Sequence, residues 1–234
     1  MRLGGKMKAL ATVISIFHRR KSTALLHSAV PPPSLYPLRM NQQTQIHHLI
    51  PHLCHGNSTS TAIALLTTCL IHTSTPPHSL PFPVLISHLT TSSTVSIFYS
   101  LSLLSSAPRR HSIYLSTLLL SSFFKNRRPK DAMEVYRWVC KEEEENAVEV
   151  GKLVVVGLCR CGEVKEAMCV VRDLVRRSGG KRFVDAEVRK WVYWGLIREA
   201  RVKEAILVGK ALLLVGDDLK CAELVDRVIQ EFKE

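Results

Sequence analysis

The stretch Gly157–Ala167, GLCRCGEVKEA, decides the fold that this sequence predicts. Its first part reads as the end of a helix, because Gly162 tolerates the positive φ that a helix C-cap requires. Its last part opens a second helix, in which apolar residues recur at helical spacing through Leu174. The stretch therefore predicts a helix–turn–helix unit whose second helix has one apolar face.

Similar stretches stand before and after it at nearly constant intervals. Gly195–Arg198, GLIR, and Arg201–Ala205, RVKEA, both follow their counterparts GLCR and EVKEA by the same offset. Upstream, Pro129–Met133, PKDAM, precedes Val164–Met168, VKEAM, by a slightly shorter one. Self-similarity at a period of about 35 to 38 residues indicates stacked helix pairs, because one pair cannot bury its apolar face alone. We therefore predict an all-α fold, an α-solenoid of antiparallel helix pairs behind a disordered N-terminal leader.

The net charge of +12 is distributed unevenly along the 234 residues. No Asp or Glu precedes Asp131, so positions 1–130 carry 13 Lys and Arg and no acid. The remainder carries 19 Lys and Arg against 20 acids. The high isoelectric point is therefore no evidence of a basic binding domain, because the predicted repeats are nearly neutral.

The N-terminal part reads as a leader followed by a linker. Residues 1–40 are basic, free of acids and contain several Ser, Thr and Ala, which is typical of an organelle transit peptide; the alternative is a disordered basic tail. Residues 41–57 contain Pro, His and Gln and read as a linker. We predict a solvated loop there rather than a metal site, because the histidines lack the paired spacing of zinc ligands.

Residues 58–112 read as a degenerate helical region with additional weak repeats. Its apolar segments, 61–72, 83–89 and 95–104, are each shorter than the roughly 18 residues that suggest a membrane span, so no membrane insertion is expected. Their lengths suit short paired helices. Strands are the alternative, because β-branched residues are frequent.

From residue 113 onward the pattern is regular. The predicted units are 113–147, 148–185 and 186–218, followed by a terminal helix at 219–234. Turn residues and apolar periodicity predict their helices. The expected helices are 114–125, one opening at Pro129, 148–160, 164–175, 185–198, 202–215 and 219–232.

The run Val154–Val175, VVVGLCRCGEVKEAMCVVRDLV, resembles a pentatricopeptide repeat. In that family the first helix ends in a Gly-Leu-Cys-Lys-like motif, and a turn glycine precedes a helix that opens with an Asp/Glu-Glu-Ala triplet. The step from Ala132 to Ala167 equals the family's 35-residue period. The resemblance covers about residues 113–234.

The resemblance implies a small plant organelle protein that binds single-stranded RNA along the groove of its solenoid. Such proteins assist the splicing, stability or editing of organelle transcripts, so a larger ribonucleoprotein or splicing complex is an expected partner. The expected location is the mitochondrion, with the chloroplast as the alternative. We expect no enzyme activity, no cofactor and no metal, since the predicted repeats contain no His and no catalytic constellation.

The same resemblance nominates the RNA-binding residues. Register with the family places base-reading positions at Thr117, at Lys152 with Arg182 or Asp185, and at Lys190. The remaining candidates are basic side chains, namely Arg176, Arg177, Lys181 and Arg189. A Lys holds a phosphate but discriminates bases poorly by itself, so no target sequence follows. The alternative for these cations is ordinary solubilising charge.

Aromatic and sulfur side chains of the repeats read mainly as core. Trp191 and Trp194 could stack on bases, but aromatic residues of repeat helices more often pack between repeats, and we predict that role. The seven Cys mostly fall where a helix needs a small apolar residue, which indicates reduced, buried thiols.

A protein-interaction adaptor that uses the same solenoid groove is the alternative function. The near-neutral repeats favour it, as do Lys152 and Lys190, which replace the small polar residues usual in the family. A tetratricopeptide array fits less well, because its period is about 34 residues and its small and aromatic positions differ.

Overall fold

A computed structural model describes residues 38–91, 97–142, 144–178, 186–212 and 218–231. The chain divides into two units, Met1–Leu35 and Tyr36–Glu234, and all described residues belong to the second. These residues form α-helices and two short 3-10 helices, with no strand among them. The transit peptide predicted at 1–40 thus lies almost entirely outside the described residues.

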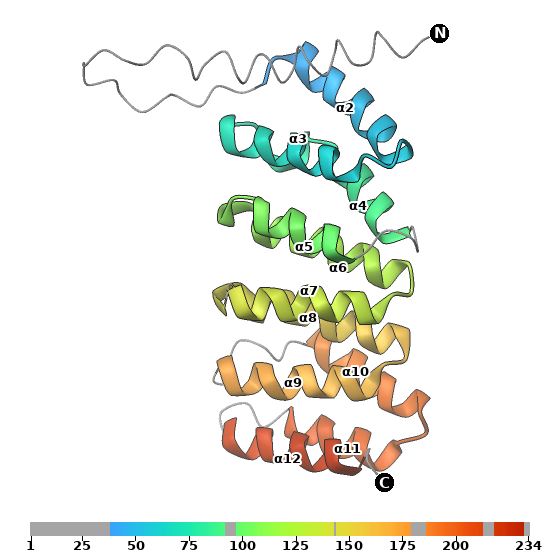
Figure 1. Ribbon diagram of the computed structural model, residues 1–234. Coiled ribbons are helices and arrows are strands. Elements are labelled where there is room, and N and C mark those ends of the chain that lie inside the picture. Colours follow the sequence, from blue (N-terminus) through green and yellow to red (C-terminus); the bar gives the residue numbers. More distant parts are fainter. Residues whose placement is uncertain (1–37, 92–96, 143, 179–185, 213–217, 232–234) are drawn as a thin grey trace, which may run out of the picture. The chain divides into compact units, whose positions relative to one another are not determined.

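The helices follow one another along the chain with short connections (Figure 1). Their bounds are α2 Met40–His55, α3 Thr59–His72, α4 Phe82–Thr91, α5 Ile97–Ser106, α6 Ser112–Lys125, α7 Pro129–Glu142, α8 Glu144–Cys161, α9 Val164–Ser178, α10 Ala186–Arg198, α11 Val202–Ala211 and α12 Asp218–Glu231. The all-helical prediction is confirmed for the described residues, and the strand alternative for the described part of 58–112 is wrong.

Two of these helices differ from the predicted bounds. Helix α8 begins at Glu144, four residues before the predicted start, because acidic residues are favourable in the first turn of a helix, at the positive end of its dipole. Helix α11 ends at Ala211, before the predicted stop. The other predicted helices after residue 112 agree within a few residues.

Neighbouring helices pack in two series. Each helix contacts the next along the chain from α2 to α12. In addition, α2 contacts α4, α4 contacts α6, α6 contacts α8, and α8 contacts α10. We call these five helices the even row. Among the helices outside the even row, α3 contacts α5, and α5 contacts α7. Helix α12 packs against α9 and α11.

The turns that join an even-row helix to the next helix recur with the same geometry. One residue in each has a positive φ, and the described turns place it at Asn57 (54°), Arg127 (56°), Gly162 (87°) and Ala200 (59°). The interval from Arg127 to Gly162 is close to that from Gly162 to Ala200, and the interval from Asn57 to Arg127 is twice that from Arg127 to Gly162. The left-handed residue reverses the chain after the helix, as in a Schellman C-cap.

The four turns also share the same backbone hydrogen bond. The amide after each positive-φ residue donates to the carbonyl five residues earlier, from Ser58 to Leu53, Arg128 to Phe123, Glu163 to Leu158 and Arg201 to Leu196, at 2.9–3.0 Å. The accepting residues are all buried. The same helix–turn–helix geometry therefore recurs in the pairs α2–α3, α6–α7, α8–α9 and α10–α11, further toward the N-terminus than the sequence motifs indicated.

The linker predicted at 41–57 is wrong, because α2 occupies Met40–His55. Ile46, Ile50, Leu53 and Cys54 are buried, and they share one face of the helix because they lie at helical spacing. An interior proline costs a helix about 3 kcal/mol, and Pro51 lies inside α2. Burial of the four apolar side chains against α3 and α4 offsets that cost.

Candidate nucleic-acid interface

Four predicted site residues lie on the even row. Thr117 is exposed on α6, Lys152 is partly exposed on α8, and α10 carries Arg189, partly buried, and Lys190, exposed. Thr117, Lys152 and Lys190 each stand ten residues before the positive-φ residue of their unit. The structure therefore places these three at equivalent positions of successive helices.

The other predicted contacts lie elsewhere. Lys181, Arg182 and Asp185 fall outside the described residues. Arg176 and Arg177 are exposed near the end of α9, which does not belong to the even row. Nη2 of Arg176 lies 2.6 Å from a carboxylate oxygen of Asp226 on α12, so this guanidinium holds two helices together.

Sequence reasoning missed three exposed cations of the even row. Lys125, Arg160 and Arg198 each stand two residues before the positive-φ residue of their unit. Each lies in the last turn of its helix, where a cation is favourable because of the helix dipole, so it does not stand out in the sequence. An alignment of the units on their turn residues, rather than on their sequence motifs, would have shown that these three cations occupy equivalent positions.

Together these residues form one exposed surface. Residues at the two equivalent positions lie within a quarter-turn of each other around a helix, so they share a face. We call the exposed side of α6, α8 and α10 the cationic face; it is defined by Lys125, Lys152, Arg160, Lys190 and Arg198. Glu149 and Glu187 lie on the same side, so the cationic face carries an excess of positive charge although residues 131–234 are nearly neutral.

Contacts between units hold this face together. Nη1 of Arg127, in one turn, donates to the backbone oxygen of Arg160 at the end of the next even-row helix, at 3.3 Å. The guanidinium carbon of Arg160 lies 4.4 Å from the centroid of the Trp191 ring on α10. This cation–π contact gives Trp191, which is partly buried, the inter-unit packing role predicted for it. These two contacts link the α6–α7 turn to α8, and α8 to α10.

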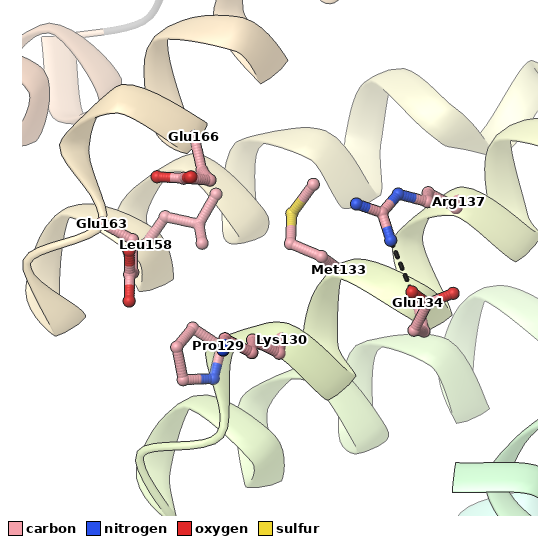
Figure 2. A pocket seen from close by; sticks show the side chains of 8 residues that line it. All are labelled: Pro129, Lys130, Met133, Glu134, Arg137, Leu158, Glu163 and Glu166. Carbon is pink, nitrogen blue, oxygen red and sulfur yellow. Dashed lines mark hydrogen bonds and ion pairs between the residues drawn. The ribbon is translucent and has the colours of Figure 1, made fainter.

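Two adjoining pockets lie mainly on α7 and α9, and Leu158 of α8 also lines one of them. They share Met133 and Arg137 of α7 and extend between α7 and α9. Figure 2 shows the first pocket, with Met133 and Arg137 on one side and Leu158, Glu163 and Glu166 on the other. Acidic and basic side chains alternate along this lining, so the pockets lack the single sign of charge that a polyanion would need.

The second pocket has a polar group at its wall. The buried Tyr136 hydroxyl makes no hydrogen bond of ordinary geometry to any described residue. Burial, together with the neighbouring Cys140 thiol, raises its pKa above the usual value. Met133 and Cys169 contribute apolar surface beside it. This lining suits a protein side chain better than a phosphate.

The thiols behave as buried core groups. Six Cys with described side chains are free, and three of them, Cys54, Cys69 and Cys159, are buried. Burial raises the pKa of Cys69 to about 11 and that of Cys159 to about 12. Thiols of this kind stay protonated and unreactive at neutral pH.

These raised pKa values predict a loss of stability at alkaline pH. Each thiol has a higher pKa in the folded chain than in the unfolded chain, so the unfolded state loses its protons first, from about pH 9 upward. We expect the free energy of unfolding to fall from pH 9 to about 11, by at most about 1.4 kcal/mol per pH unit for each thiol. Urea unfolding across this range, compared with the variant Cys69→Ala/Cys159→Ala, measures it. Equal slopes in both proteins would contradict the prediction.

The described part of the chain contains neither a membrane helix nor a metal cluster. No described helix is long and apolar enough to cross a membrane. No group of three or more His, Cys, Asp or Glu among these residues could hold a metal ion. His47, His48, His52 and His55, predicted in a solvated loop, instead project from α2, where all four are exposed.

Comparison of this chain with known proteins identifies no similar protein. Neither a family model, nor a curated protein, nor a solved structure matches this chain.

Proposed function

We propose that this protein binds single-stranded RNA along the cationic face. The observation that carries the proposal is the recurrence of cations at equivalent, exposed positions of α6, α8 and α10. A single-stranded backbone presents one negative charge per nucleotide, so a binding surface needs positive charge at intervals rather than in one cluster. A helical repeat supplies such intervals because each unit adds one copy of each position.

The pentatricopeptide resemblance of Val154–Val175 supports the same proposal. We infer a pentatricopeptide-type α-solenoid, located in the mitochondrion or alternatively the chloroplast of a plant. It assists transcript processing there within a larger ribonucleoprotein. Lys152 and Lys190 occupy the base-reading register but carry charges, so we assign them to phosphates and expect modest sequence preference.

A pair of charge reversals tests the proposal. Lys152→Glu/Lys190→Glu should weaken binding of oligouridine RNA and make the slope of log affinity against log salt shallower by about 0.7 for each phosphate that is no longer neutralised. Lys130→Glu/Lys165→Glu is the matched control, because it changes the net charge equally through exposed lysines of α7 and α9. Filter binding or fluorescence anisotropy at several salt concentrations measures both variants.

The control decides whether position matters. If both double variants lose the same affinity, net charge alone explains binding, and the cationic face is not the site. If the unmodified chain binds no RNA, the proposal itself fails. Circular dichroism of each variant must first show the native helix content.

A protein-binding adaptor remains the second candidate, and the α7–α9 pockets favour it. Their mixed charge, the Met133 side chain and the unsatisfied Tyr136 hydroxyl suit a peptide or helix of a partner. The residues that define the cationic face do not line the pockets, so the two functions are separable. Arg137→Glu should leave RNA binding unchanged while it weakens a protein partner held in these pockets.

A further inference from the structure

Trp194 stands out on the cationic face. The side chain is 52% exposed, although we predicted that it would pack between repeats, and that prediction is wrong. At the equivalent positions of the preceding even-row helices the residues are Ser121 and Val156, so the repeat itself does not require a large aromatic there. Trp is normally largely buried, because its apolar area is large. Its exposure therefore needs a reason other than packing.

The indole ring is held in place from one side. Tyr193 contacts it edge to face, with ring centroids 6.1 Å apart and planes at 81°. A Cβ added to Gly209 on α11 would lie 4.0 Å from Cδ2 of Tyr193, so the Tyr193 ring lies close to the bare backbone of α11. An aromatic ring whose orientation is fixed by its neighbour loses little freedom when a ligand binds to it.

Two cations flank the ring. Lys190 and Arg198 lie four residues before and after Trp194, which places each about 6 Å away along the helix axis on the same face. Both are exposed, and within the described residues neither forms an ion pair. The other Trp of α10, Trp191, already has the Arg160 guanidinium against its ring. Trp194 is thus the exposed Trp of this helix with positive charge on both sides.

We propose that Trp194 is a stacking platform for one unpaired nucleobase, and that Lys190 and Arg198 hold the phosphates on either side of it. The inference rests on the proposed RNA binding and adds a base contact to the phosphate contacts. Every nucleobase has a flat π face, so the platform accepts any base and gives affinity with little sequence preference. The chain would then hold the backbone along α6 and α8 and fix one base at α10.

Three variants of the full chain test the platform. Trp194→Ala should lower the affinity for a short oligouridine by about fivefold to about a hundredfold, the range expected for loss of one stacked base. Its affinity for an abasic ribose-phosphate of the same length, and its salt slope, should not change. Trp194→Phe should retain most of the affinity. Phe98→Ala, which removes a 68% exposed aromatic ring from α5, is the matched control and should behave as the unmodified chain.

Intrinsic fluorescence gives an independent readout. Oligouridine should quench the emission of the unmodified chain, because a stacked base quenches an indole. The abasic strand should quench it little, and the base-dependent part should vanish in Trp194→Phe. This variant keeps a stacking ring but loses the reporting indole, so the result identifies the residue.

The outcomes separate the platform from the proposed function. If the unmodified chain binds neither strand, RNA binding fails and the platform fails with it. If it binds both and Trp194→Ala binds both as well as before, the cationic face stands and the platform is overturned. If Trp194→Ala weakens both strands equally, or light scattering shows that it dissociates an oligomer, Trp194 is a packing or self-association residue and the platform is overturned.

Discussion

Phe123→Ala is expected to destabilise the fold by about 3–5 kcal/mol, the largest effect of any single substitution considered for this chain. The ring is fully buried on α6, a helix that contacts α4, α7 and α8. Removing it loses the transfer free energy of the ring and leaves a cavity that four helices would have to close. Backbone hydrogen bonds fix those helices, so we expect little collapse.

The position of Phe123 in the repeated turn adds to this cost. Its carbonyl oxygen accepts a hydrogen bond from the Arg128 amide in the turn. The guanidinium carbon of Arg128 lies 5.1 Å from the ring centroid. The ring therefore supports both the turn and a side chain whose Nη1 donates to the Thr90 carbonyl of the neighbouring unit at 3.0 Å. Loss of the ring is expected to loosen the junction between two units as well as the core of one.

Urea unfolding followed by far-UV circular dichroism measures the effect. Phe98→Ala makes the same chemical change at an exposed site, and it should alter the free energy of unfolding by no more than about 0.5 kcal/mol. Comparable losses in the two variants would show that burial in α6 is not what stabilises the junction.

Helices α6 to α12 could be predicted closely because two signals coincide there. Apolar residues recur at helical spacing, and breaker residues such as Pro129 and Gly162 stand at the boundaries. Both signals are local, so the sequence carries them without knowledge of the packing. Helix α2 ends before Gly56, but it contains Pro51, and His and Gln are interspersed among its apolar residues, so it read as a linker.

The repetition of the turns was only partly visible in the sequence. A glycine marks the positive-φ position at Gly162, but Asn57, Arg127 and Ala200 occupy the same conformation. Arg127 and Ala200 leave no composition signal, because the hydrogen bonds of the turn compel them to adopt that φ. Asn57 after Gly56 is such a signal, but Pro51 stands within the preceding segment, so the unit that includes α2 became apparent only from the structure.

In the candidate site, too, local features could be predicted from the sequence and features that depend on packing could not. The equivalent positions of Lys152 and Lys190 could be predicted because sequence register is local information. Arg176 could not be assessed, because its partner Asp226 lies 50 residues later on another helix. Trp194 was misjudged for a related reason: whether a side chain of α10 lies between helices or on the exposed face depends on how α10 packs against α8 and α11.

The glycine of the GLCR motif leads to the second large effect. Gly157→Ala is expected to destabilise the fold by about 1–3 kcal/mol, although alanine favours an isolated helix by about 1 kcal/mol over glycine. A Cβ at this position would overlap the Phe124 ring on α6, where two of the ring atoms would be 2.5 Å away. A Cβ on Gly195, its counterpart on α10, would lie 3.5 Å from Sγ of Cys159 on α8 and 3.0 Å from Cγ2 of Val164, the first residue of α9. The motif glycine thus permits close approach of consecutive even-row helices.

A double-mutant cycle isolates that contact. Phe124→Ala removes the ring that a new Cβ would strike, so Gly157→Ala should cost much less in its presence, and the coupling energy should be of the same size as the single-variant loss. Gly209→Ala is the matched control, because the nearest atom to its Cβ would be 4.0 Å away, and it should stabilise α11 by up to about 1 kcal/mol. Thermal and urea unfolding of the four cycle members decides the matter. Additive effects of the two substitutions would mean that overlap with the Phe124 ring is not the cause of the loss in Gly157→Ala.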